Sequence, residues 1–348
     1  MSQPILDPHI HLWDQRGTPR KASPLVKLLG WSPRALLWAG RRVFPSDLIG
    51  FFARPDYVVT DYLQPEYRAD IGGRALAGCV HVQAGWEGRG AMAPVGETRW
   101  LDGLDMPELK GIVGYADFAL GEAVEPVLAA HVEASDRFRG IRYMLANSPD
   151  PGVHSFGLVA EQSRDPKWRA GYALLAKYGL RFDAWCYQHQ LGELHELAAA
   201  YPEVPVILCH AGTPVGWAGP FSQTGLSETE RGEIDRSWRA GMARLAELPN
   251  VQVKISGLTM PVLGFGLHDR AVPPDAAALA AALGPLVRFV IDTFGPARCA
   301  FASNFPVDKI SGSWADLFDA YEAIVSDASE DERRALFHDN AVRFYELE

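Results

Sequence analysis

The sequence predicts an α/β fold in which eight strands and their connecting helices close into a single barrel, and two features favour this class. Eight strand-like segments alternate with helical stretches, and eight is the number of parallel strands that closes a (β/α)8 TIM barrel. The turns from helix to strand are short, whereas the loops from strand to helix are long, so one rim is elaborated. A doubly wound open sheet is the alternative, but no glycine-rich phosphate loop follows the first strand.

Each strand is expected where an apolar or alternating run is bounded by turn residues. The expected strands are 5–11, 77–83, 111–117, 138–145, 181–186, 205–210, 251–256 and 298–303. The clearest helical stretches are 126–135, 167–178, 191–201, 228–248 and 275–293. The long loops, at about 14–55, 85–109, 211–227 and 257–274, should lie on the C-terminal face of a distorted barrel. We expect one domain over residues 1–348, with 14–55 a loop and helical insertion over the barrel mouth.

The bulk composition favours a soluble cytoplasmic protein with a small-molecule substrate. The chain is 48% hydrophobic, and its formal net charge of −10 argues against coating nucleic acid or an anionic membrane. Its four cysteines lie far apart without a CxxC pair, so neither a disulfide framework nor a zinc finger is expected. No basic segment precedes an apolar run at the N-terminus, and the longest apolar stretch, 276–287, is expected to be too short to span a bilayer. A homo-oligomer remains open.

The clearest candidates for chemistry are three histidines. His9 and His11 lie two apart at the end of the first expected strand, so their side chains share one face with Cα atoms roughly 6.6 Å apart. His210 ends the apolar run 205–210, at the same rim. Three imidazoles around one point suit zinc with an open position for water, whose pKa such a metal lowers to about 7. The alternative is a set of hydrogen-bonded histidines without a chemical role.

Further polar side chains are expected to reach the same rim. Lys254 lies on the inward face of an alternating strand, where it would bind a substrate carboxylate or oxyanion, or form a structural ion pair. Arg142 is embedded among apolar residues and needs an anionic partner, which a substrate or a protein carboxylate such as Asp183 would provide. Gln83 shares one strand face with His81, which we interpret as a core histidine with its hydrogen bonds satisfied.

The segment 14–54 is basic and aromatic. It holds eight Lys or Arg residues against two Asp residues. Over the barrel mouth it would form a lid that screens the site and attracts anionic substrates. An oligomer contact explains its aromatic residues equally well; these are Trp31, Trp38, Phe44, Phe51 and Phe52.

Seven segments, in order across nearly the whole chain, carry a family resemblance. They are LDPHIHLWD (6–14), VHVQAG (80–85), FRGIRYML (138–145), ILCHAGTP (207–214), VKISGL (253–258), FASNFPVD (301–308) and HDNAVRFY (338–345). The sequence resembles the amidohydrolase superfamily, in the amidohydrolase-related branch with lactone hydrolases such as fuconolactonase, pyrone-dicarboxylate lactonase and sulfomuconolactone hydrolase. The resemblance implies a distorted (β/α)8 barrel that opens a lactone or related ester.

The resemblance also implies roles for particular residues. It places His9, His11 and His210 at the catalytic centre, where some relatives hold one divalent metal, here expected to be zinc, and others hold none. It further implies that Arg142 and residues near Trp13 hold the substrate.

The end of the eighth strand departs from the family pattern. The family usually has an aspartate in a Ser-Asp-Trp-Pro segment, as metal ligand and general base, whereas this chain reads Ser303-Asn304-Phe305-Pro306. Asn304 cannot usefully accept a proton at neutral pH, although its carbonyl oxygen can bind a metal or water weakly. Asp308 is a replacement for the base if the loop folds back, and a histidine without metal is another.

The preferred hypothesis is hydrolysis of a lactone that bears a carboxylate or several hydroxyls, by attack of water on the ring carbonyl. A second hypothesis is metal-dependent, non-oxidative decarboxylation, which the same branch also contains. A third is a barrel that binds a ligand without converting it, which the asparagine at position 304 keeps open.

Overall fold

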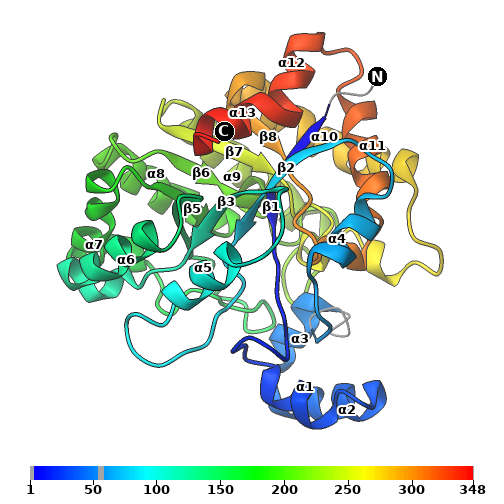
Figure 1. The fold of residues 1–348 in the computed structure, drawn as a ribbon. Coiled ribbons are helices and arrows are strands. Elements are labelled where there is room, and N and C mark those ends of the chain that lie inside the picture. The colour runs from blue at the N-terminus through cyan, green and yellow to red at the C-terminus, as the bar shows by residue number, and fades with distance from the viewer. Residues whose placement is uncertain (1–3, 54–58, 348) are drawn as a thin grey trace.

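Eight parallel strands in sequence order form the sheet of the computed structural model, which describes residues 4–53 and 59–347 (Figure 1). They are β1 (Ile5–Ile10), β2 (Leu76–Val82), β3 (Leu109–Gly114), β4 (Phe138–Met144), β5 (Arg181–Trp185), β6 (Val206–Leu208), β7 (Val251–Ile255) and β8 (Cys299–Phe301). Each lies within three residues of its expected bounds. The predicted (β/α)8 barrel is therefore confirmed.

The residues that follow β8 close the ring onto β1. Ile10 forms a parallel bridge with Phe305, the His11 amide donates to the Phe305 carbonyl at 2.8 Å, and the Asn304 amide donates to the His9 carbonyl at 2.9 Å. The buried Asp7 carboxylate on β1 accepts from the Ser303 amide at 2.9 Å. This closure brings the segment after β8 directly beside the two histidines of β1.

Helices cover the outside of the barrel (Figure 1). Those after the insertion are α4 (Gln64–Ile71), α5 (Val95–Asp102), α6 (Glu125–Ala134), α7 (Pro166–Lys177), α8 (Leu191–Ala200), α9 (Glu228–Ala246), α10 (Ala276–Phe294), α11 (Trp314–Ile324), α12 (Glu330–Arg334) and α13 (Asn340–Tyr345). The five expected helices are α6 to α10. The others were not expected, because several are shorter than three turns and carry little periodicity.

The apolar stretch in α10 was expected to be too short for a membrane span, and this expectation is wrong. The helix continues to Phe294, so that it has 19 residues. By length and composition alone, it is long and apolar enough to cross a membrane. It packs against α9, α11 and β7 as one of the outer helices of the barrel, with Leu283, Leu286 and Val290 buried.

The basic segment after β1 folds into three short helices, α1 (Ser23–Leu29), α2 (Pro33–Val43) and α3 (Ser46–Phe52). Residues 54 and 55 of the expected insertion lie outside the described residues. Figure 1 shows α1 and α2 projecting from the barrel, with α3 nearer to it. Phe51 on α3 is 2% exposed, and its ring lies 5.9 Å from that of Trp185 at the end of β5. The last helix of the segment is thus attached to the barrel mouth.

The buried His131 makes stability depend on pH. Its ring bonds to the Thr98 hydroxyl at 2.8 Å and the Tyr115 carbonyl at 3.0 Å, and burial lowers its pKa to about 4. Because an unfolded histidine titrates near 6.5, the unfolded state binds the proton first as the pH falls. The free energy of unfolding should therefore fall between pH 7 and 4, by about 2 kcal/mol from this residue at pH 5. Urea titrations of the wild type and of His131→Gln measure this difference, and equal pH slopes would contradict it.

Candidate active site

Three histidines from two parts of the barrel meet at its C-terminal rim. His9 and His11 follow the strand alternation of β1, with ring centroids 4.9 Å apart, and the ring of His210 lies 4.6 Å from that of His9. All three side chains are buried. The convergence on which the sequence interpretation depends is present in the structure.

His210 does not lie on β6 itself. The strand ends at Leu208, and His210 takes a left-handed backbone conformation, with φ at 57° and ψ at 33°. Gly257, at the end of β7, allows the approach, since a Cβ atom there would lie 2.5 Å from His210 Nδ1. Left-handed conformations cost roughly 1–3 kcal/mol in residues other than glycine and are concentrated at functional sites.

The second ring nitrogen of each histidine has a distinct environment. His11 Nδ1 lies 2.8 Å from the Val82 carbonyl, which only accepts, so Nδ1 carries the proton and Nε2 keeps a lone pair. His210 Nδ1 lies 2.9 Å from the Ser256 hydroxyl. His9 Nδ1 lies 3.5 Å from Lys254 Nζ, a distance too long to fix its tautomer, and its buried Nε2 has no hydrogen-bond partner in the described structure.

Burial keeps this cluster uncharged. It lowers the pKa of His11 to about 3 and the pKa values of His9 and His210 well below that of a free histidine. The positive charges of Lys254 and Arg142 lower the pKa values of His9 and His210 further. At neutral pH the imidazoles therefore offer lone pairs for a metal, a water proton or a polar substrate group.

Asn304 and Asp308 form a chain that leads away from the histidines. Asn304 Nδ2 donates to Asp308 Oδ1 at 3.0 Å, which leaves Asn304 Oδ1 facing His11 Nε2 at 3.3 Å. Burial raises the pKa of Asp308 to about 7. The loop does fold back, because the Asp308 amide donates to the Asn304 carbonyl at 3.2 Å. Asp308 nevertheless reaches the histidines only through Asn304, so its direct effect is to orient that amide.

Lys254 and Asp183 form an ion pair inside the barrel. Their Nζ and Oδ2 atoms are 2.5 Å apart, and both side chains are fully buried. The Tyr345 hydroxyl, from the C-terminal helix α13, lies 2.8 Å from each carboxylate oxygen. Of the two interpretations of Lys254, the structure shows the ion pair, and Lys254 does not border the cavity described next.

A cavity of about 330 Å³ opens from the histidines towards α3. Arg142, 5% exposed, borders it with its guanidinium carbon 4.9 Å from the Trp185 ring centre. Arg142 Nε has no hydrogen-bond partner, and no carboxylate within residues 4–53 and 59–347 forms an ion pair with this side chain. By contrast, Arg20 borders the same cavity but is paired with Glu97 at 2.8 Å. Arg142 is thus a buried cation without an ionic partner in the described structure, and a ligand bound in the cavity would supply that partner.

The other expected substrate-binding residues also border the cavity. Trp13 stacks on His11 with ring centroids 6.5 Å apart, and its Nε1 donates to the Thr60 carbonyl at 2.7 Å. Gln83 accepts from the Gly85 amide at 3.0 Å, while its buried Nε2 has no hydrogen-bond partner in the described structure. An acceptor group on a ligand would satisfy this amide.

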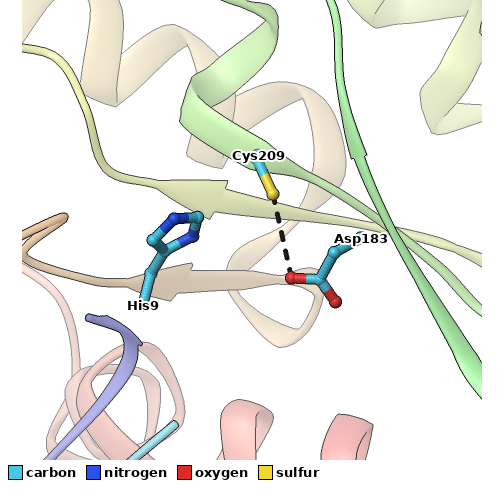
Figure 2. Close-up of side chains that lie close together, drawn as sticks. All are labelled: His9, Asp183 and Cys209. Atoms are coloured by element: carbon cyan, nitrogen blue, oxygen red, sulfur yellow. Dashed lines mark hydrogen bonds between the residues drawn. The ribbon is translucent and has the colours of Figure 1, made fainter. Parts of the chain in front are cut away.

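One group of potential metal ligands in the described structure shares His9 with the histidine cluster, and its other two members already have partners. His9, Asp183 and Cys209 bring their donor atoms within 4.8 Å of one another. Figure 2 shows the Cys209 thiol directed at the Asp183 carboxylate, with His9 apart from both. Lys254 and Tyr345 already bind that carboxylate, and burial raises the pKa of the thiol to about 12. A protonated thiol is a poor metal ligand.

The residues at the rim fit a divalent cation better. His11 Nε2 and Asn304 Oδ1 face each other as two acceptors, and His9 Nε2 is buried without a partner in the described structure. A cation would satisfy these atoms, and the ring of His210 lies beside that of His9 at 4.6 Å. The donor nitrogens of the three histidines do not all lie within 4.8 Å of one another, so they would have to draw together around the ion. The donor set is therefore His9, His11, His210 and Asn304.

Two residues of the site were not predicted as functional. Trp185, which joins Arg142 to His210, lies two residues after Asp183 on the same face of β5, so strand alternation contained the information. Tyr345 reaches Asp183 from α13, and no strand pattern could have placed it there.

Comparisons with known proteins identify the family and support the fold. The model of the amidohydrolase family matches residues 6–347. The chain is 35% identical to the uncharacterised protein y4mH of Sinorhizobium fredii, over 99% of this chain and 98% of that one. It is 29% identical to an L-fucono-1,5-lactonase of Burkholderia multivorans, over 86% of this chain and 88% of that one. A zinc-bound amidohydrolase structure from Burkholderia multivorans superimposes with a TM-score of 0.69, at 22% identity, over 99% of this chain and 100% of that one.

The family match covers nearly the whole chain. The chain therefore belongs to the amidohydrolase family and is a hydrolase.

The ion pair predicts that Lys254 acts mainly on stability. Lys254→Met leaves the buried Asp183 without its cation, so the free energy of unfolding should fall by about 3–5 kcal/mol. Lys309→Met is the matched control, since its pair with Asp70 at 2.6 Å is partly exposed and should contribute less than about 1 kcal/mol. Denaturant unfolding measures both. An unchanged stability with a raised KM would instead assign Lys254 to substrate binding.

Proposed function

We propose that this hydrolase opens a small lactone that carries an anionic group, by attack of water on the ring carbonyl. The observation that carries the proposal is the buried, unpaired Arg142 on the wall of a cavity whose floor holds neutral histidines. An anion on Arg142 would lie within one small cavity with His11 and His210. The named lactonases among the relatives, at 23% to 29% identity, support the reaction class.

His210 and Asn304 are the polar groups best placed to act on the attacking water. Both border the cavity, and His210 keeps one ring nitrogen free of protein partners when Nδ1 donates to Ser256. A neutral imidazole in this position accepts a proton from the water, and Asn304 Oδ1, held by Asp308, orients that water. Arg142 binds the anionic end and fixes the ring against the histidines.

Zinc is the metal that the site would hold, in the set His9, His11, His210 and Asn304. His210 would then be a ligand through Nε2, and its role as proton acceptor belongs to the site without metal. When bound, it would lower the pKa of a water molecule and polarise the ring carbonyl. The zinc-bound neighbour supports this choice.

Two further candidates share the cavity. A decarboxylase would also use Arg142 to bind a carboxylate, and a binding protein without turnover would tolerate Asn304 in place of an acid or base. We favour lactone hydrolysis because the relatives with assigned names are lactonases. We also propose a cytoplasmic location, which the four buried free thiols support.

The role of His210 is tested by His210→Asn, since asparagine tolerates the left-handed backbone of this position. We expect acid release from a lactone panel, followed with a pH indicator, to fall by about 10²–10⁴-fold while the far-ultraviolet circular dichroism stays unchanged. Metal analysis of the same preparations shows whether one zinc per chain is present. Retained turnover would remove His210 from the mechanism, and release of carbon dioxide in place of acid would favour the decarboxylase.

Arg142 should make the enzyme prefer lactones that carry a negative charge. Arg142→Met should lower kcat/KM by about 10²-fold for a carboxylated lactone and by less than threefold for the methyl ester of the same lactone. Lys21→Met is the matched control, because Lys21 borders the same cavity but is exposed to solvent. An equal fall in kcat/KM for the two substrates would show that Arg142 does not bind the carboxylate.

A further inference from the structure

We propose that the cavity holds a second subsite, formed by α3 and its neighbours, that binds an apolar substituent on the lactone. The inference rests on the proposed function and narrows its substrate class. The expected substrate is a lactone that carries both an anionic group and an alkyl or aryl group. It is not a sugar lactone with hydroxyls on most carbons.

A continuous row of aromatic rings leads from the histidines to α3. The Trp185 ring lies 5.7 Å from that of His210, and Phe51 and Phe156 follow at 5.9 Å and 4.7 Å from Trp185. The rings of Phe51 and Phe156 are 4.9 Å apart. This row forms one wall of the cavity, so a group attached to a ring at His210 meets carbon surface along its path.

Half-buried apolar side chains extend the same wall. They border the cavity and are partly exposed; they are Phe44, Leu48, Ile49, Phe52 and Val59. The polar side chain in contact with Phe156 is His154, with ring centroids 4.6 Å apart, and its Nδ1 is already bound to Asp47 of α3 at 2.7 Å. The cavity lining also includes the polar side chains of Gln15, Lys21 and Glu87. Several ring hydroxyls placed here would lose their hydrogen bonds to water, which costs about 1–3 kcal/mol each.

Trp185 fixes where the two ends of the substrate lie. One ring contacts the guanidinium of Arg142, the edge of His210 and the ring of Phe51. The anion site, the reacting centre and the start of the apolar wall are therefore adjacent. Two unsatisfied polar atoms also belong to residues that border the cavity, since Arg142 Nε and Gln83 Nε2 have no partner within the described residues.

The size of the cavity agrees with a substituent. A volume of about 330 Å³ lies within the range of pockets that enclose drug-sized ligands. A bare lactone ring with one carboxylate is smaller than such ligands, so the space beside α3 remains for a further group.

The test is a series of δ-lactones that carry one ring carboxylate and an unbranched alkyl chain of zero to four carbons on the ring carbon next to the ring oxygen. L-Fucono-1,5-lactone serves as the polyhydroxylated probe. We expect kcat/KM of the wild type to rise about threefold to fourfold for each methylene that enters the subsite. The polyhydroxylated lactone should be at least tenfold poorer than the butyl member.

Two variants assign the effect to α3. Leu48→Ser combined with Ile49→Ser should lower the ratio of kcat/KM between the butyl and unsubstituted members by at least tenfold. Leu28→Ser on α1, whose side chain is 69% exposed and does not border the cavity, should keep the wild-type ratio.

The outcomes separate this inference from the proposed function. A flat chain-length profile with measurable hydrolysis, or a preference for the polyhydroxylated lactone, overturns the apolar subsite and leaves the lactonase standing. A rising profile that the α3 variants do not change places the subsite elsewhere and overturns the assignment to α3. If no lactone of the series is hydrolysed, the proposed function fails and the subsite fails with it.

Discussion

The closure of the strand ring by the residues after β8 is the constraint on which the site depends. Two backbone hydrogen bonds, from Asn304 to His9 and from His11 to Phe305, join the segment after β8 to β1. They bring the Asn304 amide to His11, and Asp308 then turns the carbonyl oxygen of that amide towards the imidazole. The same backbone contacts that complete the barrel thereby assemble the polar rim.

Burial determines the charge state of everything at this rim. It keeps His9, His11 and His210 neutral, while Arg142, whose guanidinium remains protonated, lacks an ionic partner in the described structure. A buried cation without a partner is costly in a folded protein, and such costs are retained mainly where a ligand offsets them. Lys254 and Asp183 differ from Arg142 in this respect. The two side chains form an ion pair with each other, and neither borders the cavity.

The sequence was enough to predict the eight strands and the meeting of His9 and His11, because a period of two and short turns report directly on buried parallel strands. It was also enough to bring His210 to the same rim, although not its left-handed turn or the close approach of its ring to Gly257, which follows the next strand. The choice between an ion pair and substrate for Lys254 depends on Asp183 and Tyr345, which are distant in sequence. Side-chain partners across a barrel are set by packing, which a local pattern does not encode.

The central claim is that the histidine cluster and Arg142 together bind one lactone in its reactive position. A crystal structure of His210→Asn, soaked with an intact carboxylated lactone, tests it most directly. The account predicts that the ring carbonyl faces His11 and Asn304, with the carboxylate within hydrogen-bond distance of the Arg142 guanidinium. A lactone bound with its carboxylate in solvent, or outside the cavity beneath α3, would contradict it.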